Sequence, residues 1–264
     1  MVLRMAICGT MRAYMEESGL HISLAAERVG SLLGLPLTNT LTGAWLVMAI
    51  LLIVAIVVGR RPQLVPGKLQ NFFEMAFEFG LGYMENVLGS RRRAKQFFPL
   101  IATIFLFIGL SNLFDFMPFV GSIGVHHGDE LVPLFRPVNA DLNMTLALAI
   151  IAVFAIESSG IVALGLWRYG SKFINFSSPL NFVVGLIELV SELSRFVSFS
   201  FRLFGNIFAG EVLIGVVALF VPYVLPVPLM AFETFVGVVQ AAVFAMLTLF
   251  FIKLAITEPH GHKP

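Results

Sequence analysis

The sequence contains few charged residues, which make up 12% of its 264 residues, against 58% hydrophobic residues. A soluble globular domain has about 25% charged residues. Several stretches lack charge over lengths close to the ~20 apolar residues that span a bilayer core. These stretches are 41–59, 97–114, 212–232 and 234–252, while 142–167 carries only Glu157. The composition excludes a soluble domain and predicts an all-α polytopic membrane protein.

Cysteine is nearly absent as well. Cys8 is the only one, so the chain cannot form an intrachain disulfide or a cysteine-based metal site. Gly-rich phosphate loops and nucleophile elbows are also missing, so nucleotide chemistry is expected on other chains. The histidines cluster in "VHHGDE" and "EPHGHKP". Neither cluster has the spacing of a known ligand set, so we expect neither a metal nor a cofactor.

The charges that do occur are placed unevenly. Residues 60–95 hold seven basic residues against three acidic ones, whereas residues 121–141 hold three acidic residues against Arg136. Because basic loops stay on the cytoplasmic side, this pattern predicts an N-terminus outside, five crossings and a C-terminus inside. The first ten residues form too short an apolar run for a cleavable signal. We expect an extracytoplasmic segment over 1–40, a helical membrane domain over 41–256 and a cytoplasmic tail over 257–264.

Proline is missing between Pro179 and Pro222, and helical patterning persists throughout this stretch. A helix of about forty residues is ~60 Å long, twice the ~30 Å of the hydrocarbon core. Ordinary tilts of ~20° cannot absorb this excess, so the helix must be broken or must lie very obliquely. With the last helix it is expected to form a long, strongly oblique hairpin.

The predicted fold therefore has about five membrane-embedded helices plus an interfacial amphipathic helix over 66–90. In that segment Phe and Met alternate with Glu at near-helical spacing, which suits the membrane surface better than a span. No internal repeat is evident, which argues against common secondary-transporter architectures.

A polar stripe runs along the long helix. At 100° per residue its members fall within about 120° of one another; they are Glu188, Glu192, Arg195, Ser198, Arg202 and Asn206. The residues near one end, Glu188, Glu192 and Arg195, could simply reach the membrane surface. Arg202 is flanked by apolar residues on both sides, and a mid-membrane Arg costs ~2.5–3.5 kcal/mol on insertion. Ordinary packing does not explain that cost, so a functional role is the better interpretation.

The segment "RLFGNIFAGE" resembles the signature of subunit a of the F-type ATP synthase, the stator half of its proton-translocating membrane sector. Other landmarks follow in order: "FPLIATIFLFIGLSNLFDFMP" resembles the second span of the family, and "ADLNMT" resembles the start of its third. Gln240 lies in the last helix, where the family carries a glutamine. The likeness covers about residues 40–256.

The resemblance implies that Arg202 faces a rotating ring of subunit c, whose carboxylates carry the ions. Arg keeps its charge at any physiological pH, and a nearby opposite charge favours the ionised form of a carboxyl group. A ring carboxyl would thus release its proton on approaching Arg202, and the fixed cation would block a proton leak between two offset half-channels. The family assigns Glu211 and Glu233 to the outer half-channel and Glu188 to the inner one, with Asn206 and Gln240 near Arg202. Many relatives carry histidine at the position of Glu233.

Three further residues are weaker candidates. Asp115 closes the second span and either feeds the uptake path or is a plain interfacial aspartate. Glu157 is an intramembrane carboxylate without a known counterpart in the family; it either serves function or is satisfied by Ser158 and Ser159. Arg195 matches a basic family position, with a structural or charge-balancing role.

The implied partners are the c-ring, the peripheral-stalk subunit b and the rest of the F-type ATP synthase, in a bacterial plasma (inner) membrane. The chain would then not be an enzyme by itself. One alternative is a self-contained ion channel or secondary transporter that uses the stripe as its own pore. Another is a membrane-embedded hydrolase or metalloenzyme that uses Glu157, His126 and His127, for which no convincing ligand set exists.

Overall fold

A computed structural model describes residues 26, 28–32, 35–60, 67–115, 124–127, 130–170, 179–221 and 224–257. In this part of the chain, five helices are long and apolar enough to cross a membrane. They are α2 (Asn39–Gly59), α4 (Arg91–Phe114), α5 (Leu142–Leu164), α7 (Pro179–Phe220) and α8 (Pro226–Ile256). The prediction of an all-α polytopic membrane protein is confirmed. Most of the segment 1–40 and the tail 258–264 lie outside the described residues, and the three predicted parts stay predictions.

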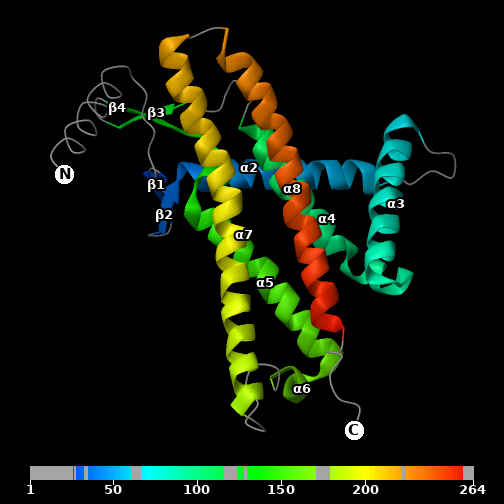
Figure 1. Cartoon of the computed structure of the whole chain (residues 1–264). Coiled ribbons are helices and arrows are strands. Elements are labelled where there is room, and N and C mark those ends of the chain that lie inside the picture. Colours follow the sequence, from blue (N-terminus) through cyan, green and yellow to red (C-terminus); the bar gives the residue numbers. More distant parts are fainter. Residues whose placement is uncertain are drawn as a thin grey trace.

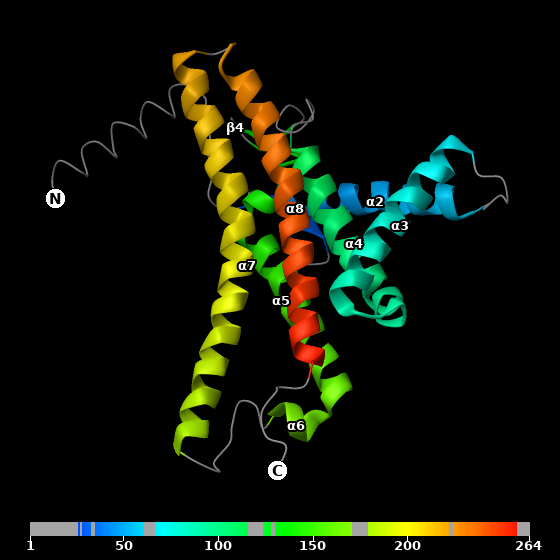
Figure 2. The same cartoon turned by 45° about the vertical axis from the view of Figure 1, so that its right-hand side comes forward.

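The helices α7 and α8 form a long hairpin whose arms lie side by side (Figures 1 and 2). Of the two alternatives for α7, the structure shows one unbroken helix of 42 residues, or ~63 Å at 1.5 Å per residue. The helix α2 runs across the direction of this hairpin. Helices that lie crosswise cannot both stand upright in a bilayer, and the length of α7 requires that the hairpin be the tilted partner.

The predicted amphipathic helix is α3 (Lys68–Leu88), which runs crosswise to α2 (Figure 1). It ends at Gly89, whose φ of 70° is the left-handed conformation that favours glycine after a helix. Phe77 of α3 packs edge-on against Phe98 of α4, with ring centroids 5.7 Å apart. Arg91 donates hydrogen bonds to Glu78 and Glu85. These contacts attach α3 to the first turns of α4, and its place at the membrane surface stays a prediction.

Two short strand pairs lie outside the helices, and neither was predicted from the sequence. They are β1 (Arg28–Leu32) with β2 (Leu35–Thr38), and β3 (Gly124–His127) with β4 (Glu130–Pro133), both antiparallel. Outside the helices, pairing of the backbone with itself satisfies its hydrogen bonds. A short 3₁₀ helix, η1 (Val138–Ala140), follows and is completely buried. The expected outer loop therefore partly enters the helical core.

The centre of the fold is the seam between α4 and α8, where small residues let the helices approach. An added Cβ at Gly237 would lie 2.9 Å from Cβ of Asn112, and one at Gly109 would lie 3.6 Å from Cβ of Ala241. The Asn112 amide donates to the Gly237 carbonyl at 2.8 Å, and it accepts a 2.6 Å bond from Asn139 of η1. Close packing of small residues and buried amide hydrogen bonds are the means by which membrane helices associate.

We expect Gly237→Ala to destabilise the helix bundle by about 1–3 kcal/mol, because the added methyl group overpacks the seam. Thermal unfolding of the detergent-solubilised chain would show this as a lower melting temperature. Gly82→Ala on α3 is the matched control, since nothing lies within 4 Å of its added Cβ. Equal melting temperatures for the two variants would show that the seam is not tightly packed.

Candidate functional site

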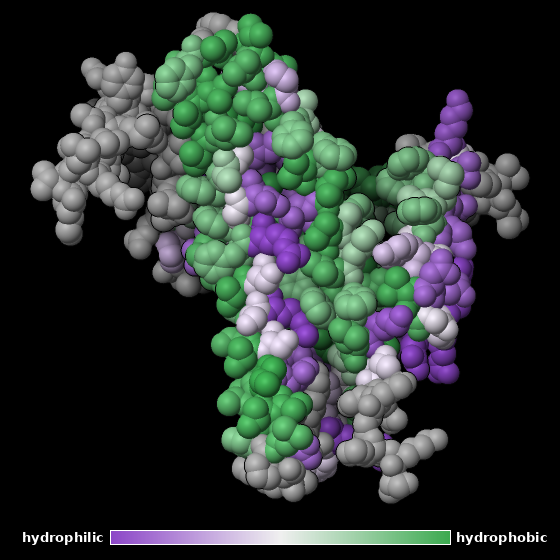
Figure 3. All heavy atoms as spheres, viewed as in Figure 1, coloured by the Kyte–Doolittle hydropathy of each residue, from purple (hydrophilic) through white to green (hydrophobic). Residues whose placement is uncertain are grey.

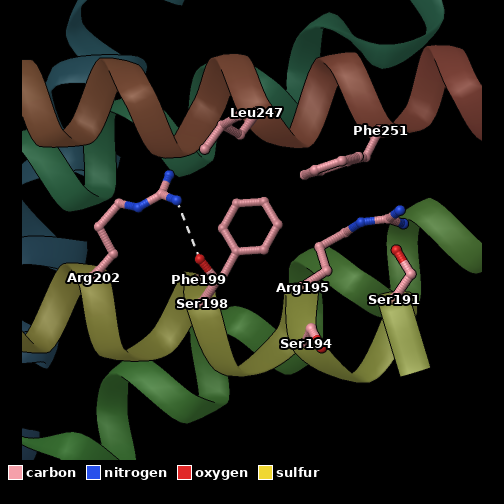
Figure 4. A pocket seen from close by; sticks show the side chains of 8 residues that line it. All are labelled: Ser191, Ser194, Arg195, Ser198, Phe199, Arg202, Leu247 and Phe251. Carbon is pink, nitrogen blue, oxygen red and sulfur yellow. Dashed lines mark hydrogen bonds between the residues drawn. The ribbon is translucent and has the colours of Figure 1, made fainter. Parts of the chain in front are cut away.

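Arg202 lies near the middle of α7, and its side chain points towards the groove between α7 and α8 (Figure 4). Its guanidinium donates to the Ser198 hydroxyl one turn away, at 3.1 Å. The side chain is exposed, and among the described residues it forms no ion pair with a carboxylate. The groove has a volume of about 300 Å³ and is lined by Ser191, Ser194, Arg195, Ser198, Phe199, Arg202, Leu247 and Phe251. Arg202 thus presents an unmatched positive charge on the surface of the chain.

The polar stripe predicted on α7 continues from Arg202 towards the start of the helix. A strip of hydrophilic residues follows the α7–α8 hairpin, with hydrophobic surface on both sides (Figure 3). Arg195 forms an ion pair with Glu192 and lies 3.9 Å above the ring centroid of Phe251. Its charge is therefore matched within the chain, unlike that of Arg202. This geometry agrees with the charge-balancing role expected for Arg195.

A second cavity, of about 200 Å³, adjoins the first and shares two lining residues with it, Arg195 and Phe251. Its lining comprises Leu164, Tyr169, Glu188, Glu192, Arg195, Phe251, Leu254, Ala255 and Thr257. Glu188, the acid predicted for the inner half-channel, thus lies in the wall of this cavity. The two adjoining cavities extend from Arg202 to the ends of α5 and α8.

Glu157 of α5 is not held by its neighbouring serines. The hydroxyl groups of Ser158 and Ser159 both donate to the carbonyl of Ala155, as serines in membrane helices commonly do. Glu157 instead accepts a 2.8 Å hydrogen bond from the hydroxyl of Tyr169. Tyr169 belongs to α6 (Leu166–Gly170), a one-turn helix. The alternative in which the serines satisfy this carboxylate is not the arrangement seen.

On the other side of Arg202, the two arms of the hairpin are joined by polar contacts. Asn206 donates to the side-chain oxygen of Gln240 at 2.8 Å. Two turns before Gln240, Glu233 is buried against the backbone of α7 at Gly210. An added Cβ at Gly210 would overlap with the Glu233 carboxylate. Glycine is therefore required at this point for the carboxylate to lie between the arms.

Asp115 and Glu211 lie in the same region and have buried carboxylate oxygens. Both oxygens of Asp115 and one of Glu211 have no hydrogen-bond partner among the described residues. Asp115 lies close enough to Glu211 and Glu233 for their charges to interact, and Glu211 similarly interacts with Arg136. Buried polar atoms without protein partners are normally solvated by internal water. The three carboxylates therefore lie in one polar region among α4, α7 and α8.

The structure thus places the predicted site residues in two polar regions with Arg202 between them. We define the outer cluster as Asp115, Glu211 and Glu233, and the inner cluster as Glu157, Tyr169, Glu188, Glu192 and Arg195. Along the axis of α7, Glu211 is ~13 Å from Arg202 in one direction and Glu188 is ~21 Å away in the other. Asn206 and Gln240 lie between Arg202 and the outer cluster.

Sequence reasoning missed two residues of these regions. Tyr169 follows the third span, and its closeness to Glu157 depends on how α6 folds back on α5. Arg136 was counted only as a loop charge, yet its residue is 6% exposed. A signal existed for Arg136, because it lies four residues before the start of the "ADLNMT" region that resembles the family. Nothing in the sequence indicated Tyr169.

The metalloenzyme alternative receives no support from the arrangement. His126 and His127 lie in β3, and the tail histidines are outside the described residues. In the described part of the chain, no group of three or more His, Cys, Asp or Glu residues could hold a metal ion.

Comparison with known proteins decides between the remaining interpretations. A family model described as "ATP synthase A chain" matches residues 41–253. The chain belongs to this family. The resemblance seen in the sequence is thus confirmed, and the chain is an integral membrane subunit of the F-type ATP synthase with a part in ion transport.

Curated relatives agree over most of their length. ATP synthase subunit a of Campylobacter jejuni (strain RM1221) is 36% identical over 220 residues, which are 82% of this chain and 89% of the relative. The subunit of Moorella thermoacetica is 32% identical over 228 residues, or 86% and 94% of the two chains. A sodium-ion-specific subunit a from Propionigenium modestum is 33% identical over 235 residues, or 89% and 79%.

We expect Gly210→Ala to destabilise the hairpin by about 1–3 kcal/mol, because the methyl group collides with the Glu233 carboxylate. The loss should be largely reversed when Glu233→Ala is added, because the colliding group is then absent. Melting temperatures of the four chains in this double-mutant cycle measure the coupling. Gly205→Ala on the same helix is the control, since its Cβ meets nothing within 4 Å. An equal loss in both backgrounds would contradict the close approach.

Proposed function

We propose that this chain is the stator subunit a that carries protons to and from the rotating c-ring of an F-type ATP synthase. Two offset half-channels reach the ring carboxylates from opposite sides of the membrane, and Arg202 separates them. One observation carries this proposal: Arg202 is exposed and without an acidic partner in the described chain, midway between two polar clusters. A charge in a membrane helix needs an opposite charge or water to compensate it, and in this proposal a ring carboxylate supplies the opposite charge.

The chemistry of Arg202 follows from its permanent charge. Because guanidinium does not lose its proton at physiological pH, Arg202 cannot relay protons itself. It favours the ionised form of a carboxylate that comes within ~4–6 Å, so a ring carboxyl gives up its proton beside Arg202. After moving away into lipid, the carboxyl regains a proton because burial favours its neutral form. The fixed cation also repels protons and prevents direct passage between the half-channels.

The outer half-channel is formed by the outer cluster. Asp115, Glu211 and Glu233 lie among α4, α7 and α8, and three oxygens of Asp115 and Glu211 there are buried without a hydrogen-bond partner in the described part of the chain. Carboxylates that are in contact with water can take up and release protons in turn. Asn206 and Gln240 join the arms of the hairpin between this cluster and Arg202; they shape the inner end of the path and are not charged carriers.

The inner half-channel is formed by the two adjoining cavities. The groove beside Arg202 contributes three serine hydroxyls, and the second cavity contributes Glu188 and Glu192. Hydroxyl groups and carboxylates can hold a chain of water molecules, along which protons move. Glu188 lies farthest from Arg202 along α7, so it is placed to exchange protons with the water outside.

The hairpin fits the curved side of a ring. Because α7 is ~63 Å long and lies crosswise to α2, its exposed face can follow neighbouring ring subunits within the membrane. In this proposal the chain is not an enzyme by itself, and subunit b anchors it in the complex. The N-terminus lies outside and the C-terminus on the cytoplasmic side of a bacterial inner membrane.

We expect Arg202→Lys to lower ATP-driven proton pumping by about 100-fold, the magnitude typical for loss of a preorganised electrostatic group. Lysine lacks the planar fork and can lose its proton. Pumping is measured in inverted vesicles that carry the whole complex, and radiolabelled sodium uptake in the same vesicles tests the other ion. Arg93→Lys, at an exposed position on α4, is the matched control. Undiminished transport with an intact complex would refute the role of Arg202.

A self-contained channel or transporter would conduct ions without a ring. We expect the purified chain in liposomes to show no proton conductance above that of empty liposomes, because each half-channel alone crosses only part of the membrane. Adding the c-ring should create conductance that Arg202→Lys changes. Conductance by the chain alone would favour the self-contained alternative.

A further inference from the structure

Leu164 of α5 and Tyr169 of α6 form part of the wall of the second cavity. Behind this wall lies an acid, Glu157, that the half-channel described above does not use. Glu157 is half-buried in α5, and its described hydrogen bond comes from Tyr169. Glu157 is not among the residues that line the cavity, whereas Tyr169 is. The tyrosine therefore lies between this carboxylate and the cavity.

The position of Tyr169 is closely defined by the fold. Gly165 separates α5 from α6 with a φ of 84°, a conformation that favours glycine, and this turn brings α6 back along α5. The Tyr169 ring packs directly on Gly160, where an added Cβ would lie 2.9 Å from its Cζ atom. The tyrosine is only 4% exposed. Packing and the 2.8 Å hydrogen bond thus hold the hydroxyl against Glu157.

The charged groups near the Tyr169 hydroxyl are three acids and one arginine. Glu157 faces it from α5, and Glu192 and Arg195 of α7 interact with it electrostatically. Glu188 lies in the same cavity wall. The residues that α8 contributes to the cavity are Phe251, Leu254 and Ala255, and Thr257 follows that helix, so this side is uncharged. Tyr169 is thus bonded to one carboxylate, Glu157, and shares the cavity wall with two others, Glu188 and Glu192.

On the basis of the proposed function, we propose that Glu157 exchanges protons with the inner half-channel through the hydroxyl group of Tyr169. A hydronium ion in the cavity forms a new O–H bond to the Tyr169 oxygen, while the original O–H proton passes to Oε2 of Glu157. The products are water, tyrosine and a neutral carboxylic acid, so the proton and its charge are conserved. The reverse transfer returns the proton to the cavity. Glu157 is then a proton store beside the inner half-channel.

The hydroxyl keeps its proton under the conditions in which this exchange must operate. Burial and the hydrogen bond to Glu157 raise the pKa of Tyr169 above its ordinary value of about 10. Tyrosine therefore remains a neutral donor across the physiological pH range and does not become a trapped anion. Its lone pairs stay available to accept a proton from the cavity side.

Two single variants and their combination test the proposal in inverted vesicles that carry the whole complex. Tyr169→Phe keeps the ring that packs on Gly160 but removes the hydroxyl, and Glu157→Gln keeps the shape of the side chain but cannot store a proton. We expect each single variant to slow ATP-driven proton pumping about five-fold. This is the rate change that corresponds to losing the net free energy of one hydrogen bond. The double variant should be no slower than either single variant, since both residues act in one series.

The dependence of pumping on pH distinguishes this role from a structural one. Glu157→Gln should make the rate less sensitive to the pH on the cavity side, because one exchanging acid is removed. Tyr83→Phe, an exposed tyrosine on α3, is the control and should change neither rate nor pH profile. If Tyr169→Phe prevents assembly, the profile of Glu157→Gln decides alone: a flatter curve supports the proposal, and an unchanged curve overturns it.

Other outcomes are equally decisive. Normal pumping by both single variants in an intact complex would overturn the proposal, and so would a double variant whose loss equals the product of the single losses. Arg202→Lys in the same assay separates this test from that of the proposed function. If Arg202→Lys stops pumping while the variants at Tyr169 and Glu157 do not slow it, only the proton store is wrong.

Discussion

The structure depends on one constraint: a charge held in the low dielectric of a membrane must be matched by an opposite charge or by water. Arg195 meets this constraint inside the chain, through Glu192 and the face of Phe251. Arg202, two turns further along the same helix, donates a hydrogen bond to Ser198 and has no acidic partner among the residues that the structure describes. In the proposed function, Arg202 is the arginine directed at a partner, whereas Arg195 is neutralised within the chain. Under that proposal, the hairpin is a support for this single side chain.

Small residues allow the polar groups to lie where this support requires them. Gly210 admits the Glu233 carboxylate between the arms, Gly160 admits the Tyr169 ring, and Gly237 lets α8 approach Asn112. In each case a methyl group in place of hydrogen would displace a polar side chain. Glycine normally weakens a helix in water, but in a bilayer close approach and buried hydrogen bonds compensate for that cost. The three glycines therefore determine how closely these polar side chains pack against the neighbouring helix backbone.

Much of the fold could be predicted because a bilayer restricts the choices. Backbone groups in hydrocarbon must be satisfied within a segment, so uncharged runs of about twenty residues had to be helices, and the length of α7 required either a break or a strong tilt. The stripe from Glu188 to Asn206 followed from helical periodicity alone. The two strand pairs were not predicted, because strands of four or five residues are too short to leave a clear alternating pattern. Nor could periodicity show that η1 is buried in the core.

The sequence by itself determined the class of the protein, the helices, the face of α7 that carries charge and the family, because these depend on composition and on local spacing. Only the tertiary structure decided which charges are matched. Glu192 and Arg195 are three residues apart, so their pairing is local, but Glu157 and Tyr169 meet through a glycine turn, and Glu233 meets α7 across the hairpin. Contacts between separate helices depend on how the helices pack against one another. The hydrophobic periodicity of the sequence does not predict that packing.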